Sequence, residues 1–171
     1  SIEILSNKII ESENPMIILG DRISHSDSSN QAVQFAELTG SKVYVSSTAE
    51  INFPTDHKQY LGALPNLLPK AKEIIDKHDL VISIGSNVFD GFFYIKGQLF
   101  GNKTYHAHID SSASAISRNE QTNLGILSSP NTALKSLIET INNKIDGEGR
   151  EKISLRKNDI HKESEKITST N

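Results

Sequence analysis

The sequence contains no cysteine among its 171 residues, which excludes disulfides, zinc ribbons, thiolate clusters and a cysteine nucleophile. Neither sign of charge dominates, because 18 Lys and Arg are set against 21 Asp and Glu, so we expect no nucleic acid or anionic membrane as the main partner. No apolar run approaches the ~20 residues of a membrane span. Residues 1–3 resemble no signal peptide. The sequence therefore predicts a soluble, cytoplasmic domain, and its start at Ser1 indicates a piece of a longer protein.

Common nucleotide-binding and catalytic motifs are also absent. The turn at residues 20–24 contains a single glycine, and no G-x-G-x-x-G follows any expected strand. The sequence has no P-loop, no H-E-x-x-H and no G-x-S-x-G. The usual dinucleotide fingerprint is therefore missing.

What the sequence does contain is an alternation of strand and helix patterns. Near-continuous apolar runs at 16–19 and 80–84 are typical of strands covered on both faces, as in a parallel sheet. We expect a three-layer, Rossmann-like α/β fold: an open parallel sheet of five to six strands with helices on both faces. The other expected strands are 42–45, 104–109 and 124–127, and the expected helices are 2–13, 28–40, 66–75 and 129–147.

The ends of these helices carry capping residues. Residues 28–31 fit a capping box, in which Ser28 accepts from the N3 amide. Asn66 and Ser129 are the other expected N-caps, and Gly40 and Gly147 are the expected stops.

The chain is expected to divide into a domain at 1–147 and a tail at 148–171. The tail holds six basic and five acidic residues with few apolar ones, so we expect a charged linker or a C-terminal helix. A regulatory or interaction domain whose charged tail docks a partner is one possible function.

Two long loops, 46–65 and 85–103, follow strands and are therefore expected at the edge of the sheet where ligands bind. Gly20 and Gly85 directly follow apolar strands, where a glycine admits a phosphate or simply forms a tight turn. Asp110 ends a strand, where it can accept hydrogen bonds from a ribose or an adenine amino group, or cap the next turn.

Three histidines offer further chemistry. His106 and His108 lie two apart on an expected strand, so both point to one face, where they could ligate a metal or pack against a helix. No third ligand can be named, so we expect no metal site. His25, between Ser24 and Ser26, lacks the carboxylate and oxyanion hole that nucleophilic catalysis needs.

Three segments together resemble the central domain of thiamine-diphosphate-dependent 2-oxo-acid enzymes. Segment 53–65 (F-P-T-D-H-K-Q-Y-L-G-A-L-P) is similar to a loop of the benzoylformate decarboxylase branch. Segments 78–89 (H-D-L-V-I-S-I-G-S-N-V-F) and 14–21 (N-P-M-I-I-L-G-D) resemble two further motifs of the domain. The resemblance covers about residues 2–145 and extends to acetolactate synthase.

The resemblance implies a six-stranded parallel sheet within an enzyme that decarboxylates or ligates 2-oxo acids on thiamine diphosphate with Mg²⁺. It implies N- and C-terminal thiamine-diphosphate-binding domains as partners, and a homo-oligomer, either dimer or tetramer. The Mg²⁺/diphosphate motif, G-D-G followed by N-N, is missing, because residues 142–143 have no G-D-G before them and Arg22 follows Gly20-Asp21. The glutamate that activates the cofactor belongs to the N-terminal domain. We therefore expect no catalytic residue here and no catalysis by this chain alone.

The resemblance leaves nucleotide binding open. In some relatives the central domain holds FAD or ADP at the carboxyl edge of its sheet, whereas in benzoylformate decarboxylase it holds none. Ser111-Ser112 after Asp110 departs from the D-P of nucleotide-binding relatives. A non-enzymatic FAD- or ADP-binding module is therefore the alternative function. Its cofactor-binding residues would be Gly20, Asp21, Gly85, Ser86, Asn87 and Asp110.

In assembled relatives, loops like 53–65 and 89–100 lie near the substrate channel at the subunit interface. Phe92, Phe93, Tyr94 and Phe100 are therefore candidates for an interface, with core packing as the other interpretation.

Overall fold

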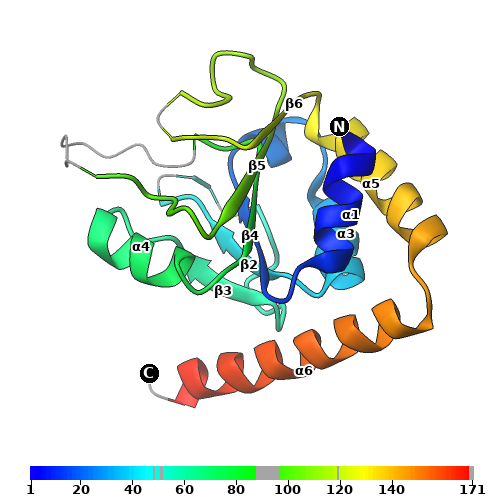
Figure 1. The fold of residues 1–171 in the computed structure, drawn as a ribbon. Helices are drawn as coiled ribbons and strands as arrows, with labels where there is room; N and C mark the ends of the chain where they lie inside the picture. Colours follow the sequence, from blue (N-terminus) through cyan, green and yellow to red (C-terminus); the bar gives the residue numbers. More distant parts are fainter. Residues whose placement is uncertain (48, 51, 88–96, 119, 170–171) are drawn as a thin grey trace.

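A six-stranded parallel sheet forms the middle layer of the chain in the computed structural model, which describes residues 1–47, 49–50, 52–87, 97–118 and 120–169 (Figure 1). The strand order is β3-β2-β1-β4-β5-β6, so the order reverses between β1 and β4. The predicted open parallel sheet is confirmed. Its strands are β1 (Pro15–Leu19), β2 (Lys42–Val45), β3 (Tyr60–Ala63), β4 (Leu80–Ile84), β5 (Tyr105–Asp110) and β6 (Leu124–Leu127).

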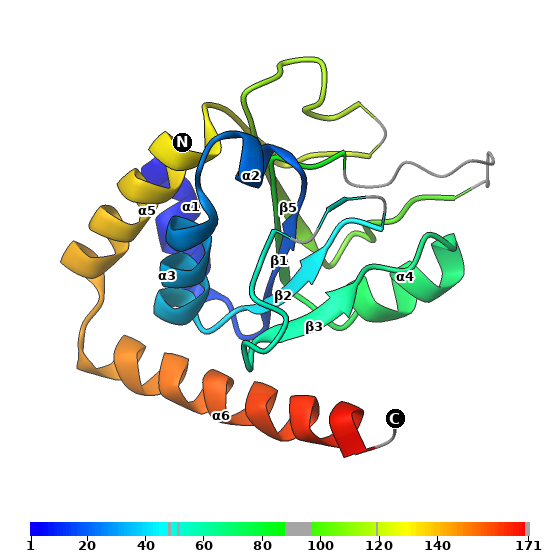
Figure 2. The same cartoon turned by 180° about the vertical axis from the view of Figure 1, so that it is seen from behind.

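Helices cover both faces of the sheet, as predicted. Three of them, α1 (Ile2–Glu11), α3 (Ser29–Thr39) and α5 (Pro130–Lys144), cover one face, and α4 (Leu68–Ile75) covers the other (Figures 1 and 2). The short α2 (Arg22–His25) follows β1 directly.

Strand β1 shows why its sequence is apolar at every position. Ile17 and Leu19 belong to the core under α1, α3 and α5, whereas Met16 and Ile18 belong to the core under α4. All four side chains are at most 1% exposed. A strand buried on both faces favours apolar side chains at successive positions, which is the pattern that the sequence of β1 shows.

Strand β3 and the start of helix α4 differ from the predictions. Strand β3 lies inside the stretch 46–65 that was expected to be a loop; its four residues are not buried, and it contains Gly62, so it has no apolar signature. Helix α4 begins at Leu68 with Leu67 at the N-cap, so the prediction of Asn66 as the cap is wrong. Pro69 in the first turn, where an amide donor is not needed, fits this later start.

The predicted caps are confirmed in part. Ser129 accepts a hydrogen bond from the Thr132 amide, and Gly40 has the left-handed φ of 62° after α3. Ser28 occupies the N-cap of α3, but its hydroxyl lies 2.6 Å from the hydroxyl of Ser26, so the capping box is wrong. Gly147 does not stop α5, which ends at Lys144; it opens the next helix.

The charged tail forms a long helix, α6 (Gly147–Ser169), which runs along the amino edge of the sheet, where the strands begin (Figure 2). Arg156 donates to the carbonyl of Thr39 at 3.0 Å, and Glu163 pairs with Lys42 at 2.6 Å. Of the two interpretations of this tail, the helix is therefore the one observed. None of the helices among the described residues is long and apolar enough to cross a membrane.

Asp79 fixes the entry into β1 from the start of the neighbouring strand. Its carboxylate accepts from the Ser12 hydroxyl at 2.7 Å and from the amides of Glu13 and Asn14 at 2.7 and 2.9 Å. Burial raises the pKa of the Asp79 carboxyl, but these hydrogen bonds outweigh it and the pKa is lowered. Asn14 and Asp79 belong to two of the motifs behind the family resemblance, 14–21 and 78–89, so a structural hydrogen bond joins these motifs.

Candidate functional site

The turns after β1 and β4 form one backbone unit at the carboxyl edge, where the strand order reverses. The Gly20 amide donates to the Ile84 carbonyl at 3.1 Å, and the Arg22 amide donates to the Gly85 carbonyl at 3.2 Å. A Cβ atom on Gly20 would lie 2.4 Å from the Gly85 oxygen and 2.4 Å from the Ser86 Cα. The absence of a side chain at Gly20 is thus required by the protein's own backbone.

Gly20→Ala is expected to destabilise the chain by about 2–3 kcal/mol, because the methyl group would overlap backbone atoms that are themselves hydrogen-bonded. Gly147→Ala is the matched control, since nothing lies within 4 Å of a Cβ there. The control is expected to be neutral or to stabilise by up to about 1 kcal/mol. Urea denaturation of both variants measures the difference, and equal stabilities would contradict the close approach.

Asp110 lies at the end of β5 and is fully buried. Its Oδ2 accepts from Arg22 Nε at 2.9 Å and from Arg22 Nη2 at 2.6 Å, and its Oδ1 accepts from the Ser112 amide at 2.8 Å. Burial raises the pKa of this carboxyl, but the neighbouring His108 and Arg22 side chains and the Ser112 amide outweigh burial and lower the pKa. The carboxylate is therefore charged at neutral pH, and both oxygens are engaged within the chain.

Arg22 links three strand ends, and sequence reasoning missed it as a site residue. Besides Asp110, its Nη2 donates to Asn87 Oδ1 at 3.0 Å, so α2 is joined to the turns after β4 and β5. Its side chain remains 26% exposed. The sequence did contain a signal for Arg22, a basic residue directly after Gly20-Asp21. It was interpreted only as a departure from the G-D-G motif.

The other predicted cofactor-binding residues also lie at this edge. Asp21 Oδ1 accepts from the Glu50 amide at 2.7 Å. Ser86 is 1% exposed, and its hydroxyl has no hydrogen-bond partner within the described part of the chain. The structure thus brings all six predicted residues to the strand ends, and their role in cofactor binding stays a prediction.

His106 and His108 point to the same face of β5, as predicted, with ring centroids 5.8 Å apart. His106 Nδ1 bonds the Gln121 carbonyl at 2.9 Å, and its Nε2 bonds the Ser83 hydroxyl at 2.9 Å. Burial lowers the pKa of His106 to about 4, with His108 adding to the effect, so the ring is neutral. Both of its nitrogens are engaged, so it is not available to a metal.

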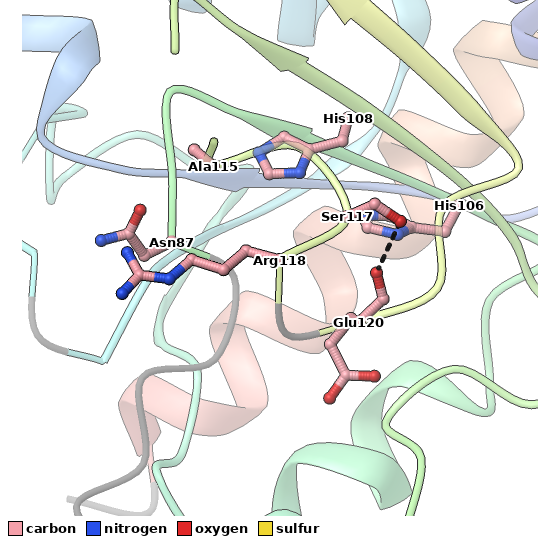
Figure 3. A pocket seen from close by; sticks show the side chains of 7 residues that line it. All are labelled: Asn87, His106, His108, Ala115, Ser117, Arg118 and Glu120. Carbon is pink, nitrogen blue, oxygen red and sulfur yellow. Dashed lines mark hydrogen bonds between the residues drawn. The ribbon is translucent and has the colours of Figure 1, made fainter. Parts of the chain in front are cut away.

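A small cavity lies beside these rings (Figure 3). Its volume of about 10 Å³ admits roughly one water molecule. His108 Nε2 is 3.7 Å from Asp110 Oδ2 and has no hydrogen-bond partner among the described residues. No three potential ligand side chains converge in the part of the chain that the structure describes. The residues around the cavity are Asn87, His106, His108, Ala115, Ser117, Arg118 and Glu120.

Segment 53–59 does not stay beside the crevice, so that expectation is wrong for this part of the loop. Phe53 is buried in the core under α3. His57 Nε2 lies 3.2 Å from Glu37 Oε1, and Gln59 donates to the carbonyls of Ala36 and Ser41. These contacts lie at the end of α3 and the start of β2, at the amino edge, because the chain must return there to begin the parallel strand β3.

The remaining candidates are His25 with its neighbouring serine and the aromatic residues of the second long loop. The Ser24 hydroxyl donates to Asn52, not to an imidazole, and His25 is exposed. Phe100 is 7% exposed and stacks on His106 with centroids 3.9 Å apart, which favours its packing interpretation. Phe92, Phe93 and Tyr94 lie outside the described residues.

Comparisons with known proteins agree with this architecture. Residues 2–137 match the family described as thiamine pyrophosphate enzyme, central domain, and the chain belongs to this family. It is 30% identical over 86 residues to benzoylformate decarboxylase of Pseudomonas aeruginosa, covering 50% of this chain and 16% of that protein. It is 26% identical over 135 residues to acetolactate synthase of Mycobacterium avium, covering 78% of this chain and 21% of that protein.

A solved structure shows the same domain within a longer chain. The crystal structure of benzoylformate decarboxylase from Polynucleobacter necessarius superposes with a TM-score of 0.76 at 26% identity. The match covers 82% of this chain and 26% of that one. The chain thus spans about a fifth of the length of the curated relatives that it matches.

Proposed function

We propose that this chain serves a thiamine-diphosphate-dependent 2-oxo-acid decarboxylase or carboligase as its structural central domain. Membership of the central-domain family supports this, together with matches to both a decarboxylase and an acetolactate synthase. The domain acts as scaffold, as a wall of the substrate channel and as an oligomer contact, with no catalytic residue of its own.

The hydrogen bonds of Asp110 are the observation that carries the structural role. Asp110 would be the acceptor for a ribose or an adenine amino group, but Arg22 and Ser112 already bind both of its oxygens. Gly20, where a phosphate would approach, is in contact with the Gly85–Ser86 backbone. Because Asp110 is also fully buried, a nucleotide could reach it only if the strand ends rearranged, which disfavours the nucleotide-binding module.

The residues of this chain do not fit the thiamine diphosphate and Mg²⁺ site. Asp21 would be the metal ligand of a G-D-G motif, but its Oδ1 accepts from the Glu50 amide. The next residue, Arg22, is a cation that pairs with Asp110. We therefore assign cofactor and Mg²⁺ binding to the N- and C-terminal domains of the parent enzyme, which we expect to be a cytoplasmic dimer or tetramer.

The full-length protein that carries this chain tests the proposal. We expect it to release carbon dioxide from a 2-oxo acid, tested with benzoylformate and pyruvate, only when thiamine diphosphate and Mg²⁺ are present. The 171-residue chain, shown to be folded by circular dichroism, is expected to be inactive under the same conditions. Turnover by the chain alone, or a full-length protein with no cofactor-dependent turnover on any 2-oxo acid, would overturn the proposal.

A further inference from the structure

A groove between α3 and α6 lies at the amino edge of the sheet, away from the crevice described above. Its cavity of about 310 Å³ is within the range of small-molecule pockets. Helix α6 forms one wall, and it lies beyond the residues that match the family. We name this cavity the α3–α6 groove; its lining includes Leu38, Ile145, Ile153, Arg150, Lys157 and His161.

The floor of the groove is apolar. Leu38 and Ile153 are half-buried side chains that pack against the main core, and Ile145 is 8% exposed. Gly40 lies directly below α6, since a Cβ there would be 3.0 Å from the Ile153 carbonyl oxygen. The helix is thus held close to α3 at this point, and the groove offers an apolar surface for a ligand.

The rim of the groove carries an excess of positive charge. Arg150 and Lys157 supply two cations, and Glu37 supplies the single carboxylate, which already contacts His57 Nε2 at 3.2 Å. Burial lowers the pKa of His161, and the positive charges of Lys58 and Lys157 lower it further. At neutral pH the groove therefore carries about one uncompensated positive charge.

A neighbouring cavity extends the groove along α6. Its volume is about 350 Å³, and it shares Glu37, Lys157 and His161 with the first. It adds residues 56–59 from the segment that resembles the family loop but leaves the crevice, so its added cation, Lys58, is balanced by an added carboxylate, Asp56. The half-buried Lys157 therefore lies where the two cavities meet, and the lining of both together still carries about one net positive charge.

From this combination we propose that the α3–α6 groove binds a small monocarboxylate with an apolar body, an aliphatic or aryl acid. The apolar body lies against Leu38 and Ile153, and the carboxylate accepts a charge-assisted hydrogen bond from Lys157. One net positive charge matches one carboxylate, whereas a dianion such as phosphate would leave the groove negative. The proposal does not rest on the proposed enzymatic function.

Calorimetric titration of the whole chain with octanoate at pH 7 tests this site. We expect saturable binding of octanoate, and binding at least about tenfold weaker for acetate, which lacks the apolar body, and for 1-octanol, which lacks the charge. Methyl signals of Leu38 and Ile153 should shift during an NMR titration. Absence of saturation, or equal affinity for octanoate and either comparison compound, would overturn the proposal.

Variants on one helix separate the groove from general surface charge. Lys157→Gln should weaken octanoate binding about tenfold, because it removes the charge-assisted hydrogen bond. Lys162→Gln is the matched control on the solvent side of α6, where the side chain is 73% exposed, and should leave the affinity unchanged.

Ser154→Phe adds a ring to the groove lining and should abolish binding. An equal effect of the two lysine variants would refute the site, as would self-association that Ser154→Phe blocks, because a second copy would then be the occupant.

Discussion

Asp110→Ala is expected to destabilise the chain by about 3 kcal/mol, the largest loss from any single side chain at the carboxyl edge. The carboxylate is fully buried and accepts two hydrogen bonds from Arg22 and one from the Ser112 amide. Its removal leaves the guanidinium, which is only 26% exposed, without its counter-charge. The loss is a large fraction of the roughly 5–15 kcal/mol that holds a domain folded.

Urea denaturation of three variants checks this result. Asp110→Asn keeps the shape and removes the charge, so its loss should be intermediate. Asp56→Ala removes an exposed carboxylate and should change stability by no more than about 0.5 kcal/mol. If Asp110→Ala were as stable as the wild type, the carboxylate would not hold the strand ends together, and a ligand-binding role would become the better interpretation.

Acidification from pH 7 to pH 4.5 is expected to destabilise the chain by several kcal/mol. The pKa values of His78 and His106 are lowered from 6.5 to about 4, mainly by burial, so both rings are neutral in the folded state. Between these pH values the unfolded chain binds more protons, so stability falls as the pH falls from about 6.5 to about 4. Each ring contributes up to about 3 kcal/mol of this loss.

The carboxylates extend the acid sensitivity below that range. The pKa values of Asp79 and Asp110 are lowered, so their contribution is present above the unfolded-state pKa and is lost as the pH falls through the folded-state values. Urea midpoints measured between pH 7 and pH 4.5 test the histidine part. His78→Gln should remove about half of the difference between these two pH values, whatever its effect at pH 7. A flat stability profile across this interval would show that the buried rings are not neutral.

The buried strands could be predicted from the sequence, because β1 and β4 have apolar side chains on both faces. Strand β3 could not, since its residues are not buried and its pairing with β2 comes from the sheet, not from its own composition. The sequence of the tail allowed two interpretations, because its charged residues outnumber the few apolar side chains that pack it against the rest of the chain. One of these is Ile160, which is 3% exposed. Local sequence patterns indicate which residues are buried. The segments at the edges of this fold bury too few side chains to produce such a pattern.

The position of the candidate site could be predicted from the sequence, but the contacts between its residues could not. Glycines after β1 and β4 and an acidic residue at the end of β5 were enough to predict a cluster at the carboxyl edge. The partner of Asp110 is Arg22, which lies 88 positions earlier in the chain, and no local sequence pattern predicts a pair so far apart. The same limit applied to His57, whose contact with Glu37 depends on where the chain returns to begin β3.

Calorimetric titration of the folded chain with FAD, ADP and coenzyme A tests whether the groups at the carboxyl edge bind one another, as in a structural domain, or bind a nucleotide. We expect no saturable binding of any of the three. Binding at micromolar concentrations or tighter, about −8 kcal/mol, that Asp110→Asn weakens would contradict it and would make the strand ends a nucleotide site.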